Sequence, residues 1–288
     1  MGMSWNLDSM SEFEEGKLFL VSTPIGNLSD LSERAIETLK TADLIACEDT
    51  RRTGQLLQLV GIQKKKLIRV DAHTEFKKKD KIVSQIKEGC RVALVSDAGT
   101  PGISDPGEHL IREVIENGLK VSVVPGASAP LVALVASGLS MKRWVMEGFL
   151  PRKGKDREHL LENLASEERT IILFESAKRL PETLNDLCRH LGGQRLIAVA
   201  RELTKIHEEV WRGSLQAASE HYTYSPKGEV VVVIEGFNEK VVVADELIIE
   251  TLRKAKDSGL SARDAAKQVS IELGIPRGKA YSFYTDLD

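Results

Sequence analysis

Short apolar runs and amphipathic stretches alternate along the first half of the chain. The apolar runs predict strands at residues 17–24, 43–48, 66–71, 91–96 and 119–125. Helices are predicted after each of them, at 31–42, 50–61, 78–89 and 108–118 and again beyond 128. Ser29 or Asp30 is expected to cap the first helix. Strands that alternate with helices in this way predict a mainly parallel sheet covered on both faces.

The pattern changes at the segment FLPRKGKDR, residues 149–157, where Pro151, Gly154 and several basic residues predict a hinge. Beyond it, strands are predicted at 169–176, 195–204, 207–215 and 228–236, with a helix at 179–193. Fewer helices per strand predict a mixed sheet. The expected organisation is a mobile leader at 1–16, a first α/β domain at 17–148 and a second α/β domain at 149–238.

After Gly236 the chain becomes helical in pattern. Three short amphipathic stretches are separated by glycine-marked turns, and Ser261 and Asp264 have the spacing of a capping box. Residues 244–288 therefore predict a helix-turn-helix-like unit. Its basic and acidic residues are nearly balanced, so a purely structural role and a binding role both stay open.

Composition narrows the class of protein. The chain has 288 residues, of which 42% are hydrophobic and 29% charged, as in ordinary globular proteins. It contains no apolar stretch long enough to span a membrane, and its start lacks the pattern of a secretory signal. Three widely spaced cysteines, Cys47, Cys90 and Cys188, argue for a reducing cytoplasm and against a zinc site or disulfides.

Three loops rich in glycine, proline and small residues follow predicted strands: STPIGN (22–27), DAGTPGISDPG (97–107) and PGAS (125–128). Ligands of open parallel sheets bind outside the carboxyl ends of the strands. Such loops bring the backbone close to a ligand, although ordinary tight turns are the alternative interpretation. The GxGxxG and GxxxxGK[ST] phosphate motifs are absent, and the loops carry hydroxyls without Lys or Arg. This composition favours a neutral or zwitterionic adenosine-type ligand.

Seven motifs occur in a fixed order: STPIGNLSD, CEDTRRT, SDAGTPGISDPG, VVPGASA, LFESAKRLPETL, ARELTKIHEEVWRG and KGEVVVVIEG. Together they resemble the tetrapyrrole methylase superfamily, specifically its ribosomal RNA small subunit methyltransferase I branch. The resemblance runs from about residue 17 to the end of the chain.

The resemblance implies methyl transfer from S-adenosylmethionine to the 2′-hydroxyl of a cytidine in the decoding centre of 16S rRNA, within the 30S subunit. It also implies two α/β domains with the methyl donor between them, and a cytoplasmic homodimer. Carried over motif by motif, the donor-binding positions are Pro24, Gly99, Thr100, Gly102, Ile103, Ser104, Ala127, Ser128, Phe174, Gly228 and Glu229.

The implied chemistry needs alignment of the attacking oxygen and a base for its proton. Candidate groups end predicted strands: Glu48, Asp49, Arg51 and Arg52; Glu175, Lys178 and Arg179; Arg201, Glu202 and Lys205. Glu202 is the preferred base, with Lys205 steadying the oxyanion, and Asp49 with Arg51 is the competing pair. The alternative is that these are ion pairs joining the two domains. The sequence shows no metal-ligand cluster.

An RNA substrate would need phosphate contacts. They are expected from Lys64, Lys65, Lys66, Lys77, Lys78, Lys79, Arg152, Lys153 and Lys155, with solvated surface as the alternative. Aromatic residues make up only 5%, so shape and the assembled subunit would supply specificity. Two other functions stay open. A methylase of a small tetrapyrrole-type metabolite would not use the basic segments, and a non-enzymatic RNA-binding protein would not need intact glycine loops.

Overall fold

The computed structural model describes residues 16–71, 74–238, 245–273 and 277–285. All of the expected leader except Gly16 lies outside these ranges. The described residues up to Phe237 form one compact unit, and those from Asn238 onward form a second.

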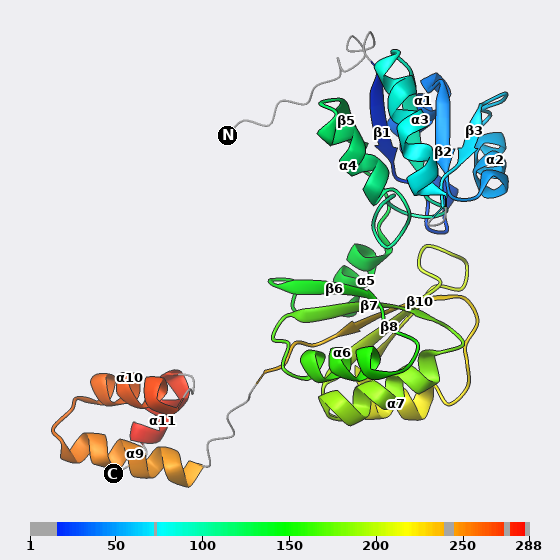
Figure 1. The fold of residues 1–288 in the computed structure, drawn as a ribbon. Helices are drawn as coiled ribbons and strands as arrows, with labels where there is room; N and C mark the ends of the chain where they lie inside the picture. Colours follow the sequence, from blue (N-terminus) through cyan, green and yellow to red (C-terminus); the bar gives the residue numbers. More distant parts are fainter. Residues whose placement is uncertain (1–15, 72–73, 239–244, 274–276, 286–288) are drawn as a thin grey trace. The chain divides into compact units, whose positions relative to one another are not determined.

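A parallel five-stranded sheet begins the first unit (Figure 1). Its strands are β1 (Lys17–Val21), β2 (Leu44–Cys47), β3 (Leu67–Arg69), β4 (Arg91–Val95) and β5 (Lys120–Val124). They lie in the order β3-β2-β4-β1-β5, and every neighbouring pair is parallel. The connecting helices are η2 (Leu28–Asp30), α1 (Glu33–Thr41), α2 (Thr50–Leu59), α3 (Glu75–Lys87) and α4 (Glu108–Glu116). The predicted parallel α/β sheet is confirmed.

Alternate residues of each strand point to opposite faces of this sheet. Leu18 and Leu20 of β1 pack with α3 and α4, whereas Val21 packs with α1 and α2. Both faces are therefore buried, as the apolar strand sequences predict.

The predicted cap of the first helix is wrong. Ser32 caps α1, because its Oγ accepts a hydrogen bond from the backbone N–H of Ala35 at 3.1 Å. Ser29 and Asp30 instead lie inside η2, which Asn27 caps. This short extra turn occupies the residues that precede α1.

The second sheet of the first unit is mixed, as predicted. Its strands are β6 (Trp144–Phe149), β7 (Thr170–Ser176), β8 (Leu196–Arg201), β9 (Glu209–Ser214) and β10 (Glu229–Ile234). They lie in the order β6-β7-β10-β8-β9, with β6 and β7 parallel and the other pairs antiparallel. One face packs on α5 (Ala129–Ser137), and the other on α6 (Lys155–Ala165), α7 (Leu180–Leu191) and α8 (Leu215–His221).

The predicted boundary at residues 148 and 149 is too late. Helix α5 packs on the second sheet, and β6 pairs with β7 inside it, so both elements belong with that sheet. The predicted hinge is the short β6–α6 connection, in which Gly154 precedes α6. The sequence pattern missed β6, whose pairing is broken by a register shift between Met146 and Gly148, and it also missed α6 and α8.

The second compact unit contains the predicted helices: α9 (Asp245–Asp257), α10 (Ala262–Leu273) and α11 (Arg277–Thr285). Their shared core includes Ile248, Leu252 and Val269. The expected cap is present, since Ser261 Oγ accepts a hydrogen bond from the N–H of Asp264 at 3.2 Å. Across the described part of the chain, no helix has the length and apolar character needed to cross a bilayer.

Candidate functional site

The three glycine loops meet at the carboxyl edge of the first sheet. Thr23 and Gly99 exchange two backbone hydrogen bonds of 2.9 and 3.0 Å. The Ser22 and Thr100 hydroxyls lie 3.0 Å apart, and Thr100 Oγ1 donates to the carbonyl of Ala127 at 3.5 Å. The loops that follow β1, β4 and β5 are thus joined by hydrogen bonds into one surface.

At two positions of this surface the backbone geometry requires glycine. Gly102 has φ of +83°, in the left-handed region, and a Cβ there would lie 3.3 Å from Ile111 Cδ1. Gly26 has a different reason, because a Cβ there would lie 2.4 Å from Lys205 Cγ and 2.9 Å from the carbonyl of Leu203. The loop after β8 therefore packs directly on the loop after β1.

A cavity of about 420 Å³, here called the main cavity, opens beside this surface. The first sheet contributes the loops after its strands, and the second contributes Phe149, Phe174 and the residues around Gly228. The rings of Phe149 and Phe174 are 5.4 Å apart and form an aromatic wall. Of the predicted donor-binding residues, the cavity is lined by Gly99, Thr100, Ile103, Ser104, Ser128, Phe174, Gly228 and Glu229.

Three predicted donor-binding residues do not line the main cavity. Gly102 and Ala127 support it from behind, through the turn and the Thr100 hydrogen bond described above. Pro24 lines a second, smaller hollow of about 210 Å³. The loop after β1 thus faces two sites.

Carboxylates are the ionisable groups of the main cavity's lining. Asp105, Glu175 and Glu229 line it, whereas Lys, Arg and His are absent from the described residues that do so. Burial raises the pKa of Asp105 to about 6, and the negative charge of Glu48 adds to this effect. The lining therefore combines apolar walls and hydroxyls with three carboxylates. Glu175 and Glu229 are each paired with a cation outside the lining, Arg179 and Lys205.

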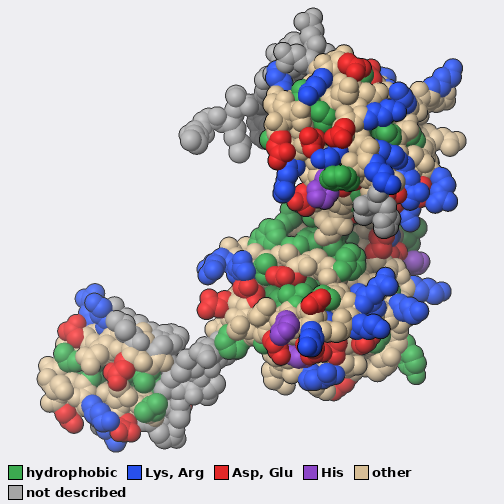
Figure 2. Space-filling model, in the orientation of Figure 1, with side chains coloured by type: hydrophobic (Ala, Val, Ile, Leu, Met, Phe, Trp, Pro, Cys, Tyr) green, Lys and Arg blue, Asp and Glu red, His purple; other side chains and the backbone are tan. Residues whose placement is uncertain are grey.

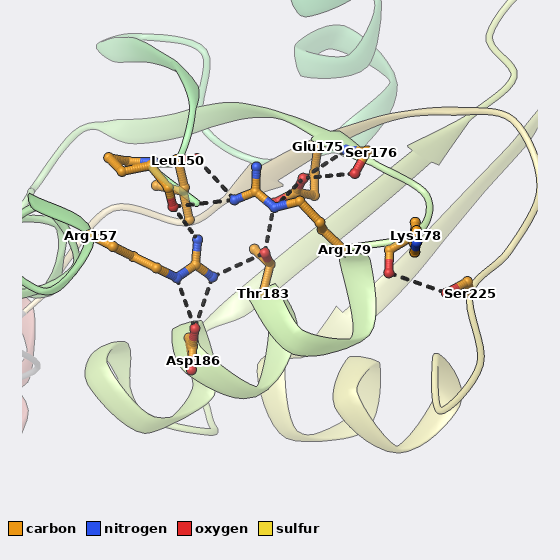
Figure 3. A network of polar contacts seen from close by, with 10 residues as sticks. Leu150, Arg157, Glu175, Ser176, Lys178, Arg179, Thr183, Asp186 and Ser225 are labelled. Carbon is orange, nitrogen blue, oxygen red and sulfur yellow. Dashed lines mark hydrogen bonds and ion pairs between the residues drawn. The ribbon is translucent and has the colours of Figure 1, made fainter. Parts of the chain in front are cut away.

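Glu175 belongs to a buried polar network behind the cavity wall (Figure 3). Its Oε2 accepts a hydrogen bond from the Thr183 hydroxyl at 2.6 Å, and its Oε1 lies 3.5 Å from Arg179 Nε. Arg157, the last basic residue of the predicted hinge segment, is buried in the same network and paired with Asp186 at 2.8 Å. These groups are paired with one another inside the protein, so Arg157 is not an exposed cation.

The preferred catalytic pair, Glu202 and Lys205, lies at the rim and does not line the main cavity. Lys205 Nζ donates to Glu202 Oε1 at 2.8 Å and to Glu229 Oε2 at 2.9 Å. The bond from Lys205 lowers the pKa of Glu202, and the N–H of Glu229 lowers it further. Burial lowers the pKa of Lys205, but the two carboxylates outweigh it and raise that pKa overall. A carboxylate held in this way is a weak proton acceptor.

The competing pair is also an ion pair. Asp49 caps α2 by accepting a hydrogen bond from the N–H of Arg51 at 2.8 Å, and its other oxygen lies 2.7 Å from Arg51 Nη2. These bonds hold the pKa of Asp49 well below its usual range. Both predicted pairs therefore have the geometry of structural ion pairs.

The basic residues expected to contact RNA are not in one patch. Lys64, Lys65 and Lys66 precede β3, so they lie at the amino edge of the parallel sheet, opposite the glycine loops. Lys77, Lys78 and Lys79 follow β3 and lie at the carboxyl edge. Figure 2 shows Lys and Arg side chains spread among acidic ones.

Several of these lysines already have partners. Lys65 Nζ donates to the carbonyl of Ala42 at 2.8 Å, Lys78 Nζ to the carbonyl of Arg69 at 2.5 Å, and Lys79 Nζ pairs with Glu113. The exposed members of the set are Lys64, Lys66, Lys77, Arg152, Lys153 and Lys155. The last three follow β6 and its cavity-lining Phe149.

Sequence reasoning missed Asp105, Phe149, Ile25 and the residues Ser176 and Ala177 as parts of the lining. Asp105 stands inside a glycine loop that was already singled out, so its carboxylate was the available signal. Phe149 was assigned to a hinge, because β6 was not recognised. In the described ranges, no cluster of three or more His, Cys, Asp or Glu could hold a metal ion.

Fold and site together define a two-sheet α/β protein with a glycine-loop cavity between the sheets. The family model of the tetrapyrrole (corrin/porphyrin) methylases matches residues 17–219. The chain therefore belongs to this family, and the predicted resemblance is confirmed.

Relatives and a solved structure give more detail. The chain is 45% identical over 276 residues to "Ribosomal RNA small subunit methyltransferase I" of Synechocystis sp., covering 95% of this chain and 99% of the relative. It is 46% identical to the protein of that name from Thermotoga maritima, covering 77% of this chain and 99% of the relative. The crystal structure of uroporphyrin-III C-methyltransferase from Thermus thermophilus, complexed with S-adenosylhomocysteine, aligns with a TM-score of 0.54 at 17% identity, covering 76% of this chain and 97% of that one. At that identity the structural match shows the fold.

Proposed function

We propose that the chain transfers a methyl group from S-adenosylmethionine to the 2′-hydroxyl of a cytidine in 16S rRNA of the 30S subunit. The main support is the match over most of its length to proteins named for methylation of small-subunit ribosomal RNA. The cation-free lining of the main cavity adds chemical support, because a sulfonium and an ammonium both carry positive charge.

The residues of the main cavity fit this donor. The loops after β1, β4 and β5 offer backbone groups and the hydroxyls of Thr100 and Ser128, while Phe149 and Phe174 offer aromatic surface. When bound, S-adenosylmethionine supplies a methyl group, which is transferred from its sulfur to an attacking oxygen aligned with the C–S bond. Gly228 and Glu229 are proposed to close the site from β10.

Asp105 is the carboxylate best suited to take the ribose proton. It lines the main cavity, and burial brings its pKa to about 6, close to the pH at which the enzyme would work. The Asp105 carboxylate would take the proton of the 2′-hydroxyl as the new O–C bond forms and the C–S bond of the donor breaks. Glu202, Lys205, Asp49 and Arg51 are proposed to hold the surrounding loops through their ion pairs.

RNA would approach at the carboxyl edge. Lys77, Arg152, Lys153 and Lys155 are exposed and are proposed to contact phosphates there. The second compact unit is proposed to strengthen this binding. It is not proposed to be essential, because 77% of this chain is enough to match 99% of the Thermotoga relative. Removing residues 238–288 should therefore raise KM for subunits severalfold while the affinity for the donor stays unchanged.

A homodimer in the cytoplasm completes the proposal. Exposed apolar side chains lie on α5 and around the start of β6: Leu131, Val135, Met141 and Trp144. Figure 2 shows hydrophobic side chains gathered over this region. Sedimentation of the chain should show a dimer, and Val135→Glu should shift it toward the monomer.

The deciding experiment incubates the full chain with methyl-labelled donor and 30S subunits. We expect label in 16S rRNA within one nucleotide that resists alkaline cleavage, because a methylated 2′-oxygen cannot attack the neighbouring phosphate. Protein-free 16S rRNA is the control for the need for an assembled subunit. Label on a base, or label in a tetrapyrrole with none in subunits, would overturn the proposal.

A further inference from the structure

The smaller hollow, here called the α2 hollow, shares a wall with the main cavity. Thr23, Pro24 and Gly26 line the α2 hollow, whereas Ile25 between them lines the main cavity. The loop after β4 repeats this division, with Ser96 and Asp97 on one side and Ala98 and Gly99 on the other. Two stretches of backbone, joined by the Thr23–Gly99 hydrogen bonds, thus separate the two sites.

The lining of the α2 hollow differs from that of the main cavity. Leu28, Leu56 and Leu59 form an apolar side, and Leu28 and Leu59 are 39% and 63% exposed. Burying such exposed leucines would be favourable, and a flat ring could do so. Unlike the main cavity, the α2 hollow contains a cation, Arg52.

Arg52 forms an ion pair with Asp97 at the wall of the α2 hollow. Arg52 Nη1 lies 3.2 Å from Asp97 Oδ2, and the two side chains are 67% and 20% exposed. The carboxylate is fixed by a second bond, because its Oδ1 accepts the N–H of Asp49 at 3.2 Å. The Asp97 carboxylate, a hydrogen-bond acceptor held in place by the backbone, therefore lies next to the exposed guanidinium of Arg52, which can donate several hydrogen bonds.

We propose that the α2 hollow receives one unstacked pyrimidine nucleoside of the RNA substrate and distinguishes cytosine from uracil through Asp97 and Arg52. This inference rests on the proposed function. The base would lie against the leucines, and its polar edge would meet the ion pair. Modifying enzymes take a nucleotide out of its stack to reach it, and single-stranded RNA is read on such exposed edges.

Hydrogen-bond chemistry gives the direction of the preference. A carboxylate accepts from the exocyclic amine of cytosine, and a guanidinium donates to the ring and carbonyl acceptors beside it. Uracil has a carbonyl in place of the amine, so it would face the Asp97 carboxylate with a second acceptor. The shared wall would then place the ribose of that nucleoside, or of its neighbour, next to the main cavity.

The first test is binding without catalysis. Saturation-transfer NMR with the full chain should detect cytidine 5′-monophosphate with at least a several-fold preference over uridine 5′-monophosphate. A saturating amount of S-adenosylmethionine should leave the cytidine signal in place. Equal signals for the two nucleotides, or loss of the cytidine signal when the donor is added, would overturn the assignment.

The second test uses matched variants. Arg52→Ala should raise KM for 30S subunits about tenfold and leave the affinity for the donor unchanged, since a good base contact is worth this much or more. Arg52→Lys keeps the charge but not the fork, and it should recover only part of the loss.

Arg189→Ala is the control, because Arg189 and Asp186 form an ion pair of similar length and exposure, 3.3 Å with 68% and 16% exposed side chains. Both residues belong to α7 and lie outside the α2 hollow. Arg52→Ala with a wild-type KM, or an equal effect of Arg189→Ala, would refute the inference. If wild-type chain fails to methylate subunits at all, the proposed function falls, and the nucleotide preference still tests the α2 hollow.

Discussion

The two sheets of the first compact unit contribute to the main cavity in opposite ways. The parallel sheet supplies three loops held together by backbone hydrogen bonds such as Thr23–Gly99, and these loops carry short polar side chains such as Thr100 and Asp105. The mixed sheet supplies side chains, with an aromatic wall at Phe149 and Phe174 and a buried network behind Glu175. The first half of the site therefore depends on loop conformation, and the second on packing and buried charge.

The largest effect is expected from a backbone change in the parallel sheet. Gly102→Leu forces an L residue into φ of +83° against Ile111, so the loop that presents Gly99 and Ile103 must move. Donor affinity measured by calorimetry should fall by a factor of roughly 100 or more. Gly118→Leu is the control, since Gly118 has φ of +69° with open space around it. Equal donor affinities of Gly102→Leu and Gly118→Leu would show that donor binding does not depend on the conformation of the loop at Gly102.

Asp105→Asn should be next in size. Loss of a general base costs roughly 10²- to 10⁴-fold in turnover. In the wild type, turnover should rise with pH through about 6, because the base must be deprotonated. This dependence should disappear in the variant. Turnover within a few-fold of wild type would exclude Asp105 as the base.

The same variant has a consequence for stability. The folded pKa of Asp105 is about 6, above its ordinary value of 3.8, so its protonated form favours folding. That stabilisation is complete below the ordinary value and is lost as pH rises through about 6. Asp105→Asn should therefore melt at a higher temperature than wild type at neutral pH, and the difference should shrink as pH falls toward 4.

In the mixed sheet, a side-chain change should affect stability more than binding. Arg157 is 4% exposed and pairs with Asp186, so Arg157→Met should cost about 3 kcal/mol of unfolding free energy. Arg189 pairs with the same Asp186 from the surface, and Arg189→Met should cost at most about 1 kcal/mol. Urea titration measures both. Equal costs would show that burial of the network contributes nothing.

The smallest effect is expected at the rim. Lys205 lowers the pKa of Glu202, so their ion pair stabilises the folded state at pH values above the ordinary pKa of the carboxyl. This stabilisation is lost as the pH falls from that value through the lowered pKa. Glu202→Gln should flatten this acid-side dependence in thermal melts and leave turnover close to wild type. A loss of turnover with unchanged melting would restore Glu202 as the base.

Local sequence was informative for the parallel sheet, because each strand there is followed by its own helix. The apolar runs at β1, β4 and β5 and the glycine loops after them could be recognised from neighbouring residues alone. Strand β6 could not be recognised in this way, because it is defined by its pairing with β7, which is distant in sequence, and because that pairing shifts register between Met146 and Gly148. Helix α6 was hidden by the charged residues that open it.

Charge patterns were the least reliable part of the sequence. The lysines between Lys64 and Lys81 form one segment in sequence, yet β3 separates them to opposite edges of the sheet. Arg157 reads as a surface cation but is buried beside Asp186. Sequence spacing alone does not determine which charges become paired.

By itself, the sequence determined the class of fold, the three glycine loops and the family, because glycine, proline and strand periodicity act through the local backbone. Tertiary structure decided the position of each carboxylate. It held Glu202 and Asp49 in ion pairs and left Asp105 half-buried in the cavity wall. It also placed Ile25 and Pro24 on opposite sides of one loop. Burial and charge pairing depend on residues distant in sequence, so their effect on chemistry appears only when the sheets pack together.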